Sequence, residues 1–84
     1  MDKAELLSTL KEILAPYTEE KEALENLNEQ TDFLEDLKIN SAHLVDIILD
    51  SEEAFDIEID DEAAETMMTV EAALKVFQDQ LTNH

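Results

Sequence analysis

The chain has 84 residues, which is the size of one small domain and leaves no room for a deep catalytic cleft. Its 23 acidic residues outnumber 5 lysines and arginines and give a net charge of −18, which argues against nucleic acid as a partner, because phosphate backbones are bound by basic patches. The chain has no cysteine, which excludes a disulfide framework and a thiolate nucleophile or metal ligand, so any thiol chemistry must arrive on an attached group.

The charge and the apolar content indicate a folded protein that meets basic protein surfaces. Long-range attraction raises encounter rates with such surfaces in a salt-dependent way. High charge with few aromatic residues can indicate disorder, but an apolar fraction of 44% at helical spacing favours a folded domain. The N-terminal MDKAELLSTL is never continuously apolar, so we expect neither a secretory signal nor membrane insertion. We expect a monomeric, cytoplasmic protein.

Residues 2–15 are predicted to form the first helix. Asp2 and Glu5 suit its positive end, and Pro16 forces it to stop near Ala15. Its core face consists of Leu6, Leu7, Leu10, Ile13 and Leu14.

Residues 16–39 are predicted to be a loop, although residues 18–30 have a second interpretation. The segment EEKEALENL could form a short helix instead. The apolar residues of that helix would be Ala23, Leu24 and Leu27. We expect the end of the segment to pack against the core through Phe33, Leu34 and Leu37.

Residues 40–55 are predicted to form the helix around which the chain is organised. Asn40 is a good N-cap, because its side-chain oxygen can accept a hydrogen bond from a backbone N–H of the first turn. Ser41 then opens the helix, with its hydroxyl at the positive end of the macrodipole. A phosphate ester on Ser41 would be stabilised where it stands. Position and residue type alone would also fit an ordinary helix-start serine.

This helix is apolar over too wide an arc for a single core face. The core face holds Leu44, Ile47, Ile48 and Phe55. A second stripe, rotated by roughly 100°, holds Ala42, Val45 and Leu49. Asp46 and Glu53 flank this stripe, and Glu52 lies between it and the core face. The acidic residues could be only a solvated face, but no lysine or arginine occurs between Lys38 and Lys75. We therefore interpret the stripe and its acidic border as a docking surface.

The remaining segments complete an all-α fold. Asp60 is expected to cap a short third helix over residues 60–66, and Thr69 a final helix over residues 69–81. Core residues expected around these helices are Ile57, Ile59, Met67, Met68, Val70, Ala73, Leu74 and Phe77. The sequence predicts a single domain over residues 1–84, a small four-helix bundle of three longer helices and one short third helix.

Three features invite other interpretations. A serine–histidine dyad with His43 has poor geometry, because residues two apart on a helix do not face each other, so we expect His43 to face solvent. The run DIEIDDE lacks the glycine that a calcium loop needs at its turn, so no metal site is predicted. Ser51, on the core face, is expected to donate to the carbonyl of Ile47. Alternatively, its small side chain leaves room for a bulky acyl chain.

Residues 33–77 resemble the acyl carrier protein family. The matching motifs are the aromatic-x-E-D-L entry FLEDL, the attachment segment NSAHL, the helix end EEAFD, an E-I segment and the TVEAA start of a final helix. In that family the serine carries a 4′-phosphopantetheine arm whose terminal thiol holds acyl groups as thioesters, so the resemblance implies that Ser41 is the attachment site. It also implies that residues 18–30 are a long loop with at most a turn or two of helix, and that a separate phosphopantetheinyl transferase supplies the base and magnesium-bound coenzyme A.

The sequence departs from the family pattern at three positions around that serine. Asn40 stands where the family usually has Asp, which is a mild change because both residues cap helices well. Ala42 stands where it usually has Leu, which removes a large apolar contact. Lys38 stands where it usually has Gly, which removes a permissive residue from the loop and adds a positive charge. Together these departures suggest a specialised carrier rather than a housekeeping one.

Three functions remain open. The first is an acyl carrier protein, not itself an enzyme, that presents acyl intermediates to enzymes of fatty-acid, polyketide or related lipid biosynthesis through their basic docking surfaces. The second is an unmodified acidic interaction module of the same fold. The third is an aminoacyl or peptidyl carrier domain. The resemblance favours the first and leaves the acyl group and the pathway open.

Overall fold

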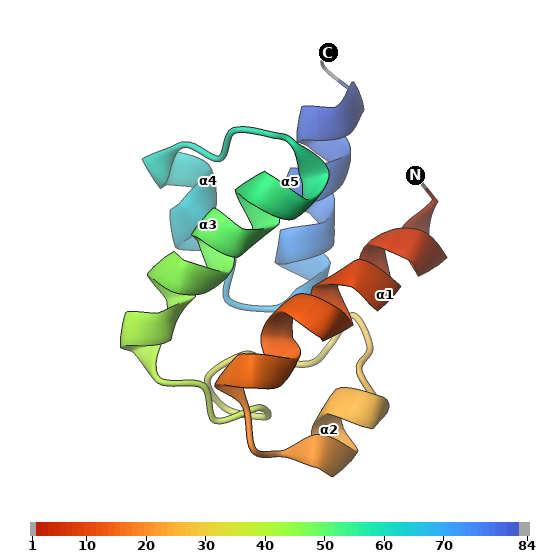
Figure 1. Cartoon of the computed structure of the whole chain (residues 1–84), viewed down its shortest axis with the longest axis vertical. Helices are drawn as coiled ribbons and strands as arrows, with labels where there is room; N and C mark the ends of the chain where they lie inside the picture. Colours follow the sequence, from red (N-terminus) through yellow and green to blue (C-terminus); the bar gives the residue numbers. More distant parts are fainter. Residues whose placement is uncertain (1, 83–84) are drawn as a thin grey trace.

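Five α-helices and two short 3₁₀ turns make up the helical structure of residues 2–82, which the computed structural model describes. The helices are α1 (Lys3–Leu14), α2 (Lys21–Glu25), α3 (Leu44–Phe55), α4 (Asp61–Thr66) and α5 (Val70–Thr82), and the 3₁₀ turns are η1 (Ala15–Tyr17) and η2 (Ser41–His43). Helix α1 packs against both α3 and α5, and α4 and α2 lie toward opposite ends of the molecule (Figure 1). The described residues contain no strand, only an isolated bridge between Asp32 and Thr69. The predicted all-α bundle is confirmed.

Helix α1 begins at a side-chain cap and buries one face. The carboxylate of Asp2 accepts a hydrogen bond from the backbone N–H of Glu5 at 2.9 Å, which satisfies one of the orphan donors of the first turn. One helical turn apart, Leu6, Leu10 and Leu14 are fully buried. The helix then tightens into η1, where Pro16 cannot donate the next helical hydrogen bond.

Helix α3 contributes the centre of the core. Its buried residues Ile47, Ser51 and Phe55 again follow the four-residue spacing of one helix face. The ring of Phe55 packs against that of Phe77 on α5, with centroids 4.6 Å apart and planes tilted by 37°. This contact fixes the C-terminal half of α3 to α5.

Two residues with positive φ replace the glycines that this chain lacks. Asp56 ends α3 in the left-handed conformation, with φ 54° and ψ 52°, and its N–H donates to the carbonyl of Glu52. Lys38 has φ 53° in the turn before η2. Both side chains are exposed, so these turns are made without burying a charge.

Helices α4 and α5 begin at the predicted caps. Asp60 accepts from the N–H of Ala63 at 2.7 Å, and Thr69 accepts from the N–H of Ala72 at 3.2 Å. The buried residues of α5 are Val70, Ala73, Leu74, Val76 and Phe77. The expectation that Met68 fills the core is wrong: Met67 is buried, whereas Met68 is 40% exposed. The carbonyl of Met68 accepts from the N–H of Phe33, and this pairing holds its backbone against the loop while its side chain reaches the surface.

The prediction of a loop over residues 16–39 is wrong for Lys21–Glu25, which form α2. The bundle therefore has five α-helices in the described residues rather than four. The apolar residues of the helical interpretation, Ala23, Leu24 and Leu27, are partly buried against the core. This packing stabilises a helix that would be too short to form alone.

The structure reveals no helix in residues 2–82 with both the length and the apolar character to cross a membrane.

Candidate functional site

Ser41 is the first residue of η2, the 3₁₀ turn that leads into α3, and it is exposed. The side-chain oxygen of Asn40 accepts from the N–H of Ala42 at 2.9 Å, and the Asn40 carbonyl accepts from the N–H of His43 at 2.8 Å. Asn40 is therefore the predicted N-cap. The first turn differs from the expected helix over residues 40–55 in being 3₁₀, since the N–H of Leu44 donates to the Ser41 carbonyl.

The loop before Ser41 is anchored on both sides of Lys38, the residue with positive φ. Leu37 is fully buried and Ile39 is 3% exposed, so both side chains fix the backbone that flanks Lys38. The N–H of Ile39 donates to the Phe33 carbonyl at 3.0 Å. The hydroxyl of Thr18 donates to the Leu37 carbonyl at 2.6 Å and ties this loop to the end of η1. These contacts place Ser41 on the surface in a defined backbone.

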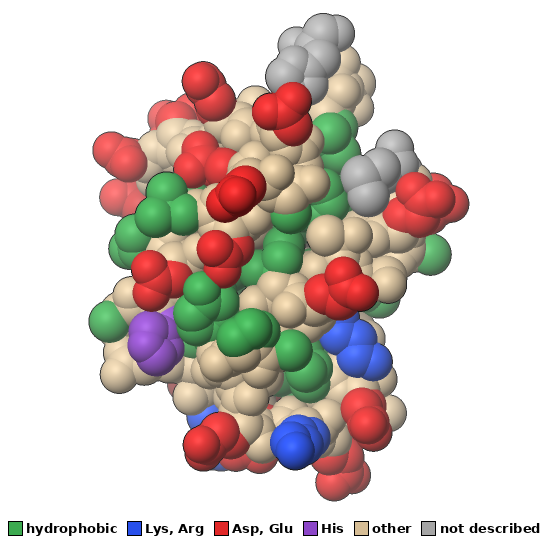
Figure 2. All heavy atoms as spheres, in the orientation of Figure 1, with side chains coloured by type: hydrophobic (Ala, Val, Ile, Leu, Met, Phe, Trp, Pro, Cys, Tyr) green, Lys and Arg blue, Asp and Glu red, His purple; other side chains and the backbone are tan. Residues whose placement is uncertain are grey.

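The predicted docking stripe lies on the solvent side of α3. Val45 is 61% and Leu49 56% exposed, and Ala42 is also exposed. Apolar side chains appear over α3 among acidic ones in Figure 2, whereas lysines occur only toward the lower part of that view. An exposed apolar strip with a border of one charge is typical of a protein interface.

The acidic residues of the predicted docking surface have two different environments. Asp46 and Glu53 are exposed. Glu52 is half-buried, and its carboxylate accepts from the N–H of Ile59 at 2.8 Å. Glu52 therefore holds the connection between α3 and α4, a structural task that sequence reasoning missed.

A cluster that includes His43, two residues after Ser41, joins η1 to α3. The hydroxyl of Tyr17 donates to the carboxylate of Asp50 at 2.6 Å. The Tyr17 ring also lies against the exposed His43, with ring centroids 5.5 Å apart. The hydrogen bond to Asp50 raises the pKa of Tyr17 to about 12, with further contributions from burial and from the charges of Asp50 and Asp46.

Sequence reasoning missed this cluster because Tyr17 and Asp50 are 33 residues apart in the chain. The available signal was that His43 and Asp50 are two helical turns apart and so share a face.

Ser51 is fully buried, and its hydroxyl donates to the Ile47 carbonyl at 2.7 Å, as predicted. This hydrogen bond satisfies the hydroxyl donor of Ser51 inside the core.

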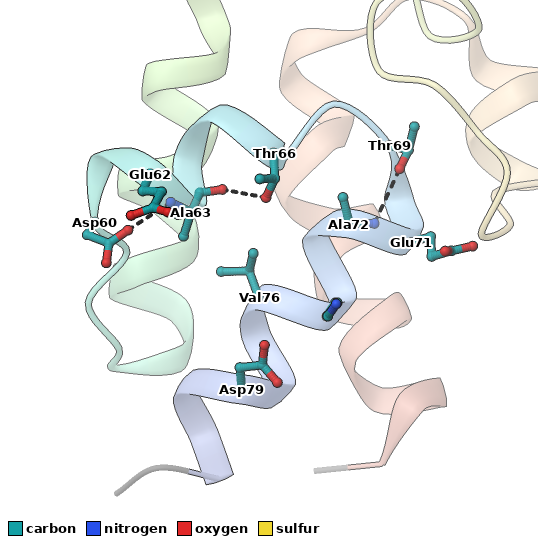
Figure 3. Close-up of a pocket in the computed structure, with 10 residues that line it drawn as sticks. Asp60, Glu62, Ala63, Thr66, Thr69, Glu71, Ala72, Val76 and Asp79 are labelled. Carbon is teal, nitrogen blue, oxygen red and sulfur yellow. Dashed lines mark hydrogen bonds between the residues drawn. The ribbon is translucent and has the colours of Figure 1, made fainter.

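A groove of about 540 Å³ opens between α4 and α5 (Figure 3). Its floor includes Ala63, Ala72 and Val76. Two hydroxyls at this groove are already used, because Thr66 donates to the Ala63 carbonyl and Thr69 caps α5. None of the predicted site residues lines this groove. Among residues 2–82, no three His, Cys, Asp or Glu side chains gather to hold a metal ion.

Together these features define a class of protein: a small all-α domain that presents a serine at the start of a helix, beside an exposed apolar stripe bordered by acids. No protein-family model matches the chain, and no curated protein matches it. Among solved structures, the chain is similar to the acyl carrier protein from Enterococcus faecalis, with a TM-score of 0.77 and 26% sequence identity. The match covers 95% of this chain and 99% of the other. This likeness supports the acyl carrier protein family for the chain, and it supports a carrier role rather than a catalytic one.

Proposed function

We propose that the protein carries acyl groups as thioesters on a 4′-phosphopantetheine arm attached to Ser41. It would present them to enzymes of fatty-acid, polyketide or related lipid biosynthesis. The observation that carries this proposal is the exposed Ser41 at the start of η2, in a backbone fixed by the Asn40 cap.

The residues around Ser41 fit a phosphodiester at that position. The start of a helix favours a negative group, because its backbone N–H groups point outward and the macrodipole is positive there. Lys38, three positions before Ser41, adds a positive charge to the same loop. No acidic residue lies between Lys38 and Leu44, so the sequence next to the hydroxyl carries no repelling carboxylate.

The attachment step needs little from this chain. The Ser41 oxygen forms a bond to the phosphorus of the pantetheine phosphate of coenzyme A, its proton passes to a base of the transferase, and adenosine 3′,5′-bisphosphate leaves. A transferase that holds magnesium-bound coenzyme A supplies the base and the Lewis acid. Ser41 therefore has to be accessible rather than activated. Once attached, the arm supplies a thiol that holds the acyl group.

Partner enzymes would dock on the stripe of Ala42, Val45 and Leu49, with Asp46 and Glu53 meeting basic residues at the rim. Charge at a rim mainly raises the association rate and selects the partner, whereas a small apolar contact gives modest affinity. Such brief binding suits a carrier that visits several enzymes in turn.

Intact-mass measurement tests the proposal. The wild-type protein and Ser41→Ala are incubated with a broad-specificity phosphopantetheinyl transferase and coenzyme A. We expect one arm on the wild type and none on Ser41→Ala, and a matched Ser8→Ala variant should gain an arm like the wild type. No gain on the wild type would favour an unmodified interaction module. If an adenylating enzyme then loads an amino acid onto the arm, an aminoacyl carrier is favoured over an acyl carrier.

A further inference from the structure

A groove of about 430 Å³ lies beside Ser41, and its lining includes Asn40 and His43 but none of the residues of the docking stripe. One wall comes from η1 and the residues that follow it, and the other from the loop and turn that contain the serine. The residues used below are Pro16, Tyr17, Thr18, Lys38, Asn40 and His43, and the acidic residues Glu19 and Glu20 also line the groove. Because Asn40 and His43 bracket Ser41 in sequence, anything attached to Ser41 starts at the edge of this groove.

The walls of the groove are held in place without a ligand. Tyr17 is fixed by its 2.6 Å hydrogen bond to Asp50 and by its contact with the His43 ring. Thr18 is fixed by its 2.6 Å hydrogen bond to the Leu37 carbonyl. The groove is therefore largely pre-formed, and its volume lies in the range of roughly 300–1,000 Å³ typical of small-molecule sites.

The chemistry of the lining matches the arm of the proposed function. Pantetheine begins at a phosphodiester, continues through a carbon that bears two methyl groups, and then alternates amides with short methylene segments. Lys38 offers a cation at the phosphodiester end, whereas the carboxylates of Glu19 and Glu20 can accept hydrogen bonds from the amide N–H groups farther along the arm. The aromatic pair of Tyr17 and His43, with Pro16, offers an apolar wall for the methyl groups.

Because the arm is covalently tethered to Ser41, weak contacts are sufficient to hold it in the groove. Binding of a tethered group is intramolecular, with an effective concentration on the order of millimolar for a short flexible linker. Asp50 lies on a face of α3 next to Asp46 and Glu53, and Val45 and Leu49 lie on the other side of these two acidic residues. An arm in this groove would leave the docking stripe uncovered.

We propose that the arm attached to Ser41 rests in this groove, with its methyl groups against Tyr17 and His43 and its phosphodiester beside Lys38. This inference rests on the proposed function. It assigns to Tyr17 and His43 a binding role that no motif in the sequence carries. A partner that docks on the stripe would therefore receive the arm from one defined starting position, the groove beside Ser41.

Nuclear magnetic resonance of the full-length, isotope-labelled protein in its modified form tests the proposal. We expect nuclear Overhauser contacts between the methyl protons of the arm and the ring protons of Tyr17 and His43. His43→Ala, at an exposed position, should keep the fold and lose these contacts. Met68→Ala, which removes an exposed side chain that does not line this groove, should retain them.

A second measurement uses the absence of cysteine from the chain, since a maleimide spin label then reacts with the thiol of the arm alone. We expect the amide signals of Tyr17 and Thr18, on the groove wall opposite the serine, to lose more intensity than those of residues that line the α4–α5 groove. The inference would be overturned if the arm made no contacts, or if the spin label broadened the amide signals of residues that line the α4–α5 groove instead. Either result would leave attachment at Ser41 intact. If mass measurement finds no arm, the proposed function fails and this inference fails with it.

Discussion

Replacing Asp56 by glycine should stabilise the protein. Asp56 ends α3 with φ 54° and ψ 52°, and its exposed side chain removes no packing when it is lost. The left-handed conformation costs an L-residue about 1–2 kcal/mol, with aspartate toward the low end. Its carboxylate also sits at the negative end of the helix dipole, which costs about 0.3–1 kcal/mol. Glycine opposes these gains through the entropy of the unfolded chain by about 0.4–1 kcal/mol.

The net expectation for Asp56→Gly is about 1 kcal/mol of stabilisation, which raises Tm by roughly 4–8 °C in a domain of this size. Thermal and urea unfolding followed by circular dichroism measure it. Asp56→Asn is the matched control, because it removes the charge and keeps a side chain that tolerates the left-handed region, so it should gain only the dipole part. If Asp56→Gly is no more stable than Asp56→Asn, the cost of the left-handed conformation does not exceed the entropy that glycine adds to the unfolded chain, and the reasoning fails.

Four further predictions concern the site and its surroundings. Lys38→Gly should be more stable than Lys38→Ala by about 1 kcal/mol in urea unfolding, because alanine keeps the penalty of a positive φ; equal stabilities would contradict this. Tyr17→Phe should be less stable than wild type at neutral pH. Since the folded pKa of Tyr17 is raised from 10.0 to about 12, this advantage of the wild type should be present below pH 10 and lost as pH rises through about 12, and a constant gap in pH-dependent unfolding would refute it. Ser51→Leu should lower stability by about 1–3 kcal/mol through overpacking of a fully buried position, whereas a tolerated leucine would reveal room for an acyl chain. Leu49→Asp should leave unfolding unchanged within about 0.5 kcal/mol and lower kcat/KM of the transferase by roughly fivefold or more, and an unchanged kcat/KM would remove Leu49 from the docking surface.

The long helices were predictable because their apolar periodicity and caps agree. Leu6, Leu10 and Leu14 mark one face of α1 in sequence and are buried together in the structure. Asp60 and Thr69 begin α4 and α5 as their residue types suggest. These signals are local, so one sequence suffices to read them.

The features that sequence reasoning missed depend on contacts between distant segments. Helix α2 has five residues and forms because Leu24 packs against the core, a contact that its own sequence does not encode. Glu52 resembles its acidic neighbours in sequence, yet the structure uses it to hold the N–H of Ile59. The same limit applies to the bond between Tyr17 and Asp50.

The most direct test of the central claim is peptide-resolved mass spectrometry of the protein isolated from the cells that make it. Our account predicts one phosphopantetheine, with or without an acyl group, on the peptide that contains Ser41. Ser8 and Ser51 provide internal controls and should be unmodified. An unmodified Ser41 in the native protein, or an arm on another residue, would contradict the account.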